Sequence, residues 1–264
     1  MSERTSAPGA FGARGADMGA GMFSPSESIA PEQHASTLTV ARTASGEAIV
    51  EGRPTSLAVR VPEAATRCPG ITVKGNNLKT FAYTTDVAIA RNCNADAFFA
   101  VYPFTGEPII TQALMSVAQK PLFVGVGGGT TTGQRVVELA MVAEMQGVAG
   151  VVINAPAPAE TIGRVMAAVD IPVVATVLAD DELTAEKVLA GAAILNVAAG
   201  GRTADVVASI RAHYPDMPVL ASGGSTEESM MATIAAGADA LTWTPPSSQQ
   251  IQAQMMARYR GVGA

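Results

Sequence analysis

Charged and aromatic side chains are scarce in this 264-residue sequence. Charged residues make up 15% and aromatic residues 5%, whereas an average soluble protein is about 25% charged. The net charge is −6 and the basic residues are scattered. Nucleic-acid binding needs clustered positive charge, so we expect no nucleic-acid partner. So few charges also suggest surface buried between subunits, and we expect a homo-oligomer.

Histidine is nearly missing, with His34 and His213 the two examples. His34 lies in the N-terminal segment, and His213 lies at the end of an expected helix, away from any site. We therefore expect neither a His-based triad nor a His-ligated metal. A Mg²⁺ bound by Asp180 or Asp181 is an open alternative, but our prediction is no metal and no cofactor.

Long apolar runs and paired cysteines are also lacking. No run reaches the ~18 residues of a membrane span, and the N-terminus has no apolar segment of the secretory type. Cys68 and Cys93 are the two cysteines. We read them as reduced thiols in a cytoplasmic protein with no membrane partner.

What the sequence does contain divides it into three segments. Residues 1–35 are rich in Gly, Ala, Ser and Pro, which is typical of a mobile arm. Residues 36–68 contain three stretches in which apolar and polar residues alternate, and this pattern predicts an antiparallel β extension. Residues 69–264 repeat one unit of apolar strand, turn and amphipathic helix.

The repeated unit occurs eight times, and eight parallel β–α units close a barrel. We predict a (β/α)₈ TIM barrel, with a doubly wound open sheet as the alternative; the cofactor fingerprint of such sheets is missing. The expected strands are Gly70–Lys74, Ala97–Tyr102, Leu122–Val126, Gly150–Asn154, Pro172–Val177, Ala193–Val197, Pro218–Ala221 and Ala240–Trp243.

In such a barrel the active site lies at the C-terminal ends of the strands. Lys74 would end the first strand, and strand alternation would point its side chain into the barrel. A buried lysine among neutral walls has a lowered pKa, which suits Schiff-base or base chemistry. The alternative is that Lys74 reaches solvent or pairs with Glu107, which is itself a candidate acid/base or merely a helix-start residue.

The other strand ends carry neutral polar side chains that suit hydrogen bonding to a substrate. The expected ones are Tyr102, Asn154, Thr176, Asn196 and Thr242. The alternative is that the amides only tie loops together. Asp180 and Asp181 are candidate bases, but a helix N-cap explains such a pair better.

A Gly-Gly turn follows the seventh strand, in Ser222-Gly223-Gly224. Backbone N–H groups at such a turn and at the following helix start can bind an anion, and barrels often hold phosphate after strands seven and eight. We therefore predict phosphate at Gly223 and Gly224, against the alternative of a turn without a ligand.

The half from Leu122 to Trp243 resembles the keto-deoxy-phosphogluconate (KDPG) aldolase family. The resemblance rests on five stretches: Val124-Gly-Val-Gly-Gly-Gly-Thr130, Gly150-Val-Val-Ile-Asn-Ala-Pro156, Ile171-Pro-Val-Val-Ala-Thr-Val-Leu-Ala179, Ala193-Ile-Leu-Asn-Val-Ala-Ala199 and Tyr214-Pro-Asp-Met-Pro-Val-Leu-Ala-Ser-Gly-Gly-Ser225. It implies a (β/α)₈ barrel, phosphate at Gly223 and Gly224, and a trimer. The family's Schiff-base lysine would fall at Asn196, so its usual aldol mechanism is not implied.

From these observations we expect an enzyme that acts on a small phosphorylated sugar or keto acid. The expected reaction is that of an aldolase-type lyase with catalytic residues Lys74, Glu107 and Asn196. One alternative is an isomerase or epimerase on the same barrel, using proton transfer. Another is a barrel that binds a metabolite without catalysis.

Overall fold

The computed structural model describes residues 39–42, 46, 48–51 and 59–261. The chain divides into two compact units, Met1–Arg53 and Pro54–Ala264. The predicted mobile arm, residues 1–35, lies outside the described residues. The first unit contributes a two-stranded ribbon and the second contributes the barrel.

The ribbon consists of strands β1 (Thr39–Arg42) and β2 (Ala48–Glu51), which pair antiparallel with Thr39 opposite Glu51. The predicted antiparallel extension is therefore confirmed for the first two alternating stretches. The first half of the third stretch, residues 56–58 of 56–61, lies outside the described part of the chain. Its residue Val59 forms an isolated parallel bridge with Cys93 instead of a ribbon strand.

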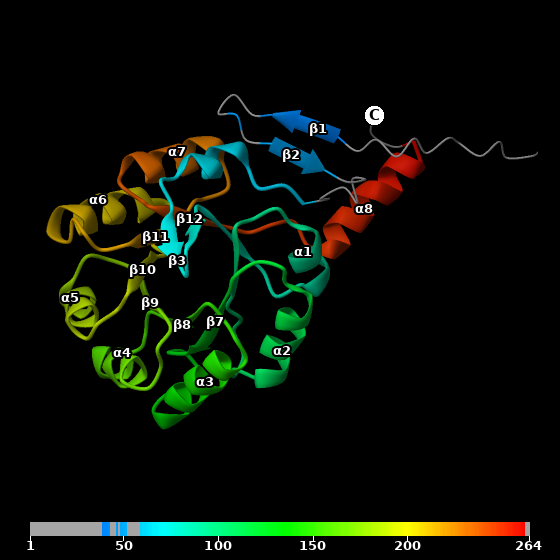
Figure 1. Cartoon of the computed structure of the whole chain (residues 1–264). Coiled ribbons are helices and arrows are strands. Elements are labelled where there is room, and N and C mark those ends of the chain that lie inside the picture. The colour runs from blue at the N-terminus through cyan, green and yellow to red at the C-terminus, as the bar shows by residue number, and fades with distance from the viewer. Residues whose placement is uncertain (1–38, 43–45, 47, 52–58, 262–264) are drawn as a thin grey trace, which may run out of the picture. The chain divides into compact units, whose positions relative to one another are not determined.

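Eight parallel strands of the second unit close into a barrel, which confirms the predicted fold (Figure 1). Neighbours along the chain are neighbours in the sheet, and the last strand pairs with the first to complete the ring. The strands are β5 (Thr80–Tyr83), β6 (Ala97–Ala100), β7 (Leu122–Gly127), β8 (Gly150–Ile153), β9 (Val173–Val177), β10 (Ile194–Val197), β11 (Val219–Ser222) and β12 (Ala240–Trp243).

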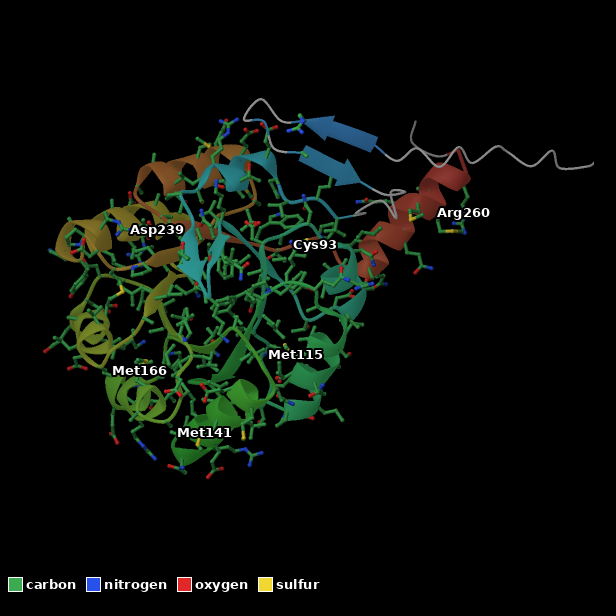
Figure 2. The ribbon with its side chains drawn as sticks, in the orientation of Figure 1. Cys93, Met115, Met141, Met166, Asp239 and Arg260 are labelled. Carbon is green, nitrogen blue, oxygen red and sulfur yellow. The ribbon has the colours of Figure 1, made fainter. Side chains whose placement is uncertain are left out.

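Helices surround the barrel as an outer ring (Figure 1), and Met141 and Met166 belong to this layer (Figure 2). No helix in the described ranges is long and apolar enough to cross a membrane. The elements are η1 (Glu63–Arg67), α1 (Val87–Asn92), α2 (Pro108–Val117), α3 (Gln134–Met145), α4 (Ala159–Met166), α5 (Glu182–Leu189), η2 (Gly200–Arg202), α6 (Thr203–His213), α7 (Glu227–Ala235) and α8 (Ser248–Tyr259).

The prediction that Gly70–Lys74 forms the first barrel strand is wrong. Residues Ile71–Val73 form β3, which pairs antiparallel with β4 (Asn76–Leu78) in a separate hairpin. Lys74 and Gly75 form the two-residue turn, with φ of 48° and 80°. Two positive φ values match the turn type that suits the twist of a tight hairpin.

This hairpin closes the N-terminal end of the barrel. It ends at Leu78, one residue short of β5, and the Gly70 nitrogen donates to the carbonyl of Asp239, which directly precedes β12, at 2.7 Å. Ile71, Val73 and Leu78 are buried in one cluster with the side chains of the barrel interior. These three side chains point into the barrel, whereas Lys74, which was expected to point inward, is exposed at the closed end.

Above the hairpin the barrel interior is packed with large apolar side chains. Phe81 meets Phe123 edge-on at 5.2 Å and Phe99 at 6.4 Å between ring centroids. All three rings are almost fully buried. The interior is a solid core at this level, so any ligand must enter from the C-terminal end of the strands.

The hairpin turn yields a stability prediction. Lys74→Asn should raise the free energy of unfolding by about 0.5–1 kcal/mol, because Asn adopts positive φ at a lower cost than Lys does. Gly75→Ala should lower it by about 1 kcal/mol or more, since the added Cβ disfavours positive φ. Urea unfolding of both variants measures the two changes; equal effects of both variants would contradict the turn geometry.

Candidate active site at the barrel mouth

A cavity of about 370 Å³ opens at the C-terminal end of the barrel, and we call it the mouth cavity. Seven of the predicted site residues line it; four lie on strands β9 to β12, one directly follows β8, and two form the turn after β11. The lining consists of Tyr83, Phe99, Val101, Asn154, Thr176, Asn196, Ala198, Ser222, Gly223, Gly224, Thr242 and Thr244.

Strand alternation explains why these side chains converge. Every second residue of a strand faces the same side, and in β9 and β10 the apolar Val174 and Ile194 occupy the core below the mouth. Two residues further, Thr176 and Asn196 face the cavity in the same direction. The strands therefore change from apolar to polar at one level, which separates the core from the site.

Asn196 has an unsatisfied acceptor. Its Nδ2 donates to Thr176 Oγ1 at 3.2 Å, but its Oδ1 has no hydrogen-bond partner, and the residue is 6% exposed. A buried acceptor without a partner costs free energy. A ligand that supplies a hydroxyl or N–H donor at this point would remove that cost.

The turn after β11 offers fewer anion donors than the sequence indicates. The Gly223 nitrogen already donates to the Thr242 carbonyl at 3.1 Å, so the expectation that it binds phosphate loses its basis. The Gly224 nitrogen makes no hydrogen bond to any described residue. Gly224 has φ of 75°, and a Cβ there would come within 2.3 Å of Ser229 Oγ, so only glycine fits.

The N-terminus of α7, next to this turn, is already capped. Thr226 and Ser229 form a reciprocal capping box, and Glu227 and Glu228 lie in the first turn. These groups satisfy backbone donors and add negative charge, which weakens the helix end as an anion site. The remaining candidate donors for a phosphate are the Gly224 nitrogen and the hydroxyls of Ser222, Thr242 and Thr244.

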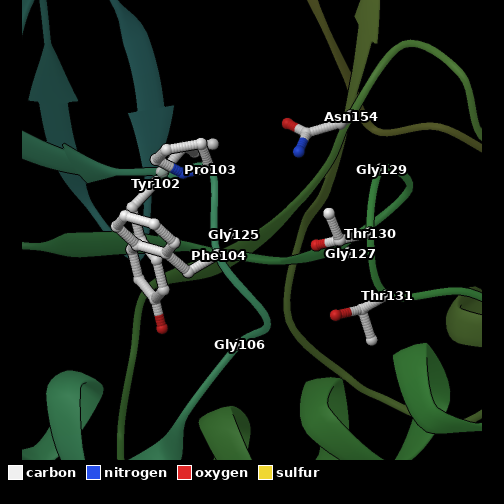
Figure 3. Close-up of a pocket in the computed structure, with 11 residues that line it drawn as sticks. Tyr102, Pro103, Phe104, Gly106, Gly125, Gly127, Gly129, Thr130, Thr131 and Asn154 are labelled. Atoms are coloured by element: carbon white, nitrogen blue, oxygen red, sulfur yellow. The ribbon is translucent and has the colours of Figure 1, made fainter.

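A second cavity of about 250 Å³ adjoins the mouth and shares Val101 and Asn154 with it (Figure 3). The predicted residue Tyr102 lines this cavity and not the mouth; its hydroxyl accepts from the Glu107 nitrogen at 2.9 Å. Thr131, which is 5% exposed, also lines it, and its Oγ1 has no partner.

Two of the three predicted catalytic residues do not reach the mouth cavity. Lys74 lies in the hairpin turn at the opposite end of the barrel. Glu107 occupies the N-cap position of α2, exposed, and contributes to a separate crevice behind the mouth. Asn196 alone lies in the cavity.

The candidate aspartates are engaged in structural contacts. Asp181 caps α5, accepting from the Thr184 nitrogen at 2.9 Å, as the capping alternative predicts. The Asp180 carboxylate binds Ser209 Oγ and His213 Nδ1, at 2.5 and 2.6 Å, on α6. Neither aspartate lines the mouth or the adjoining cavity.

Tyr83 is the titratable side chain in the mouth that the sequence prediction missed. It lies two residues after the interior Phe81, so alternation would have identified it had the first barrel strand been placed correctly. Burial raises the pKa of the Tyr83 hydroxyl above its ordinary value of 10.0. Tyr83 therefore stays protonated at neutral pH and can donate a hydrogen bond or a proton.

The walls of both cavities carry no formal charge. Neither is lined by Asp, Glu, His, Cys, Lys or Arg, and the described residues contain no cluster of three side chains suited to a metal. The mouth thus offers no carboxylate to bind a Mg²⁺ ion directly. What it offers is hydroxyls, amides and backbone groups.

No family model and no curated protein matches the sequence. Solved structures with a similar fold include a phosphonopyruvate hydrolase in complex with oxalate and Mg²⁺, with TM-score 0.54 and 15% identity, covering 71% of this chain and 82% of that chain. A phosphoenolpyruvate phosphomutase from Streptomyces platensis subsp. rosaceus has TM-score 0.53 and 14% identity, covering 69% and 80%.

A mandelate oxidase is about as similar, with TM-score 0.54 and 16% identity, covering 72% of this chain and 79% of that chain. Three different activities at such low identity establish the barrel fold alone. The fold that the KDPG aldolase resemblance implied is confirmed. The more specific resemblance to that family has no support among these structures.

The unsatisfied oxygen of Asn196 yields a prediction on the ligand-free protein. Asn196→Leu should leave the free energy of unfolding unchanged or raise it by about 1–2 kcal/mol, because it removes a buried acceptor that costs about 1–3 kcal/mol unpaired. Urea unfolding without ligand tests this. A clear loss of stability would mean that the amide is a structural tie.

Proposed function

We propose that the mouth cavity binds a small phosphorylated sugar or hydroxy-keto acid. The observation that carries the proposal is the buried, unsatisfied Oδ1 of Asn196, a residue that lines the polar cavity, because a ligand donor such as a hydroxyl would satisfy this acceptor. The phosphate would lie at the Gly224 nitrogen and the hydroxyls of Ser222, Thr242 and Thr244. Asn154 and Thr176 would bind the remaining oxygens.

The size and polarity of the cavity support a ligand of this class. About 370 Å³ lies at the lower end of the range for small-molecule sites, about 300–1,000 Å³. Neutral donors can hold a phosphate, although without the added strength of a charged partner. Two of the similar structures are named for phosphonopyruvate and phosphoenolpyruvate chemistry, which is consistent with a phosphorus-containing keto acid.

The position of Lys74 does not support a Schiff-base mechanism centred on this residue. The Lys74 amine is exposed at the closed end of the barrel, and the packed phenylalanine core separates it from the mouth. An isomerase or epimerase reaction also loses support, since it needs groups in the site that both take and return a proton. No carboxylate, imidazole or amine lines the mouth.

A second candidate is lyase chemistry with Tyr83 as proton donor. Tyr83 is the one titratable side chain that lines the mouth, and its raised pKa keeps it protonated. In a retro-aldol cleavage the bond between the α- and β-carbons of a β-hydroxy carbonyl compound breaks, its electron pair forms the enolate, and the β-hydroxyl becomes a carbonyl by losing its proton to solvent water. The Tyr83 hydroxyl would hydrogen-bond the enolate oxygen or protonate the α-carbon, and the tyrosinate would regain its proton from water.

Binding is tested by calorimetry with 3-phosphoglycerate, phosphoenolpyruvate and inorganic phosphate. We expect 3-phosphoglycerate, which carries a hydroxyl, to bind about 10-fold more tightly than phosphoenolpyruvate, because a well-placed hydrogen bond to a buried acceptor contributes about 1–1.5 kcal/mol. Asn196→Leu should remove that difference. Thr242→Val should weaken all three ligands, whereas Thr111→Val, at a buried position of α2 outside the mouth, serves as the matched control. No binding at millimolar concentration would refute the proposal.

Catalysis is tested by ³¹P NMR of the same compounds incubated with protein. Tyr83→Phe should lower any turnover by about 100-fold or more, the lower end of what general acid catalysis contributes, while leaving ligand affinity nearly unchanged. With Tyr83 acting as acid, turnover should persist up to pH 10 and fall only above it, because its pKa is raised from 10.0. Binding without turnover would leave the metabolite-binding alternative.

A further inference from the structure

Lys187 is a buried lysine on the outer side of the barrel wall. It belongs to α5, is 1% exposed, and has no role in the mouth described above. Its Nζ donates to two backbone carbonyls, those of Ala155 at 2.7 Å and Thr176 at 3.1 Å. Lysine is almost never fully buried unless its charge is compensated, so this placement needs a reason.

Both carbonyls belong to segments that carry mouth residues. Ala155 directly follows Asn154, which lines both cavities. Thr176 lines the mouth, and its Oγ1 accepts from Asn196. One ammonium group therefore joins the loop after β8 to strand β9, at the points where these segments present their side chains to the ligand site.

We propose that Lys187 is a positioning residue, which fixes Asn154 and the Thr176–Asn196 pair of the mouth by clamping the two carbonyls from outside the barrel. The inference rests on the mouth being the ligand site, but the geometry that it predicts exists without any ligand. The loop after β8 has further anchors on the other side, where the Asn154 nitrogen donates to the Gly127 carbonyl at 2.8 Å.

An ammonium group suits this task because it supplies up to three donors from one atom at the end of a long stem. An apolar side chain of the same length would fill the space and leave both carbonyls without this donor. The clamp is lost when the amine is removed, and it weakens when the amine loses its proton, because a neutral amine is a weaker donor than an ammonium group.

The surroundings of Lys187 make its protonation sensitive to alkaline pH. Burial lowers the pKa of the amine below its ordinary value of 10.5, while the carboxylate of Asp181 opposes this shift. Asp181 is the one charged neighbour in the small cavity around the amine; the other lining residues are Ala155, Pro156, Val177, Leu178, Leu183 and Thr184. As pH rises through this lowered pKa, the ammonium becomes a neutral amine and the clamp weakens.

The test uses ¹³C-detected NMR of the wild-type protein to follow the deprotonation of Lys187 and the response of Asn154 and Asn196. The sequence has four lysines, at positions 74, 79, 120 and 187, so protein labelled at lysine Cε gives four signals, and the missing one in Lys187→Met identifies Lys187. Asparagine labelled at Cγ reports Asn154 and Asn196, each identified by its Asp variant. Detection on carbon avoids loss of amide protons at high pH.

We expect the Lys187 signal to titrate with a midpoint below 10.5, and the Asn154 and Asn196 signals to shift with the same midpoint. In Lys187→Arg, whose guanidinium stays charged, both asparagine signals should show no such midpoint. Asparagine signals that stay constant while Lys187 titrates would overturn the proposal. Lys187→Arg also lacks the Lys187 signal and so identifies it, and the comparison therefore remains decisive even if Lys187→Met does not fold.

Ligand binding gives the second readout, with 3-phosphoglycerate as the probe. Lys187→Met should weaken binding about 10-fold to 100-fold, as displaced site residues commonly do, and Lys120→Met, which removes an exposed lysine, should have no effect. A loss of affinity that 0.5 M NaCl abolishes would be a long-range charge effect and would contradict the clamp. If the wild-type protein does not bind 3-phosphoglycerate but the Lys187, Asn154 and Asn196 signals titrate with one midpoint, the proposed function is refuted. The positioning role of Lys187 is then still supported.

Discussion

Closure of the sheet is the constraint on which the rest of this structure depends. In a closed parallel barrel each strand has one face inside, and the alternation of side chains sends every second residue into a shared interior. Because all eight strands run in the same direction, their C-terminal residues meet at one end. A change from apolar to polar residues at the same level in several strands then produces a solid core and a polar mouth.

The two ends of the barrel differ: the N-terminal end is closed by a hairpin, and the C-terminal end is open and polar. At the N-terminal end the β3–β4 hairpin covers the apolar interior with Ile71, Val73 and Leu78, and its turn can be exposed and polar. At the C-terminal end the interior is left open, and the lining consists of uncharged hydrogen-bonding groups. Burying neutral polar groups costs less than burying charges, which allows the mouth to keep an unpaired acceptor such as Asn196 Oδ1 in the absence of ligand.

Several charged groups outside the mouth bind backbone groups at or near the ends of the barrel strands. Asp96 accepts from the Lys79 and Thr80 nitrogens at the start of β5, and the Arg211–Asp239 pair ties the segments that enter β11 and β12. Lys187 likewise ties the segment that leaves β8 to strand β9. Charge is used here to fix backbone carbonyls and strand ends, and the ligand site itself stays neutral.

The sequence by itself determined the fold, because eight apolar runs alternating with amphipathic helices have few other ways to bury their surfaces. It also determined the inward residues of β9, β10, β11 and β12, since period-two alternation places Thr176, Asn196, Ser222 and Thr242 once a strand is recognised. What the tertiary structure decided was the start of the barrel. Residues 70–74 and 80–83 are both short apolar runs, and only sheet pairing shows that the first joins a hairpin and the second closes the ring. This strand pairing places Lys74 outside the site and Tyr83 inside it. The burial of Lys187 could not be read from the sequence either, because its two carbonyl partners are 11 and 32 residues away and become neighbours only when the helix packs on the barrel.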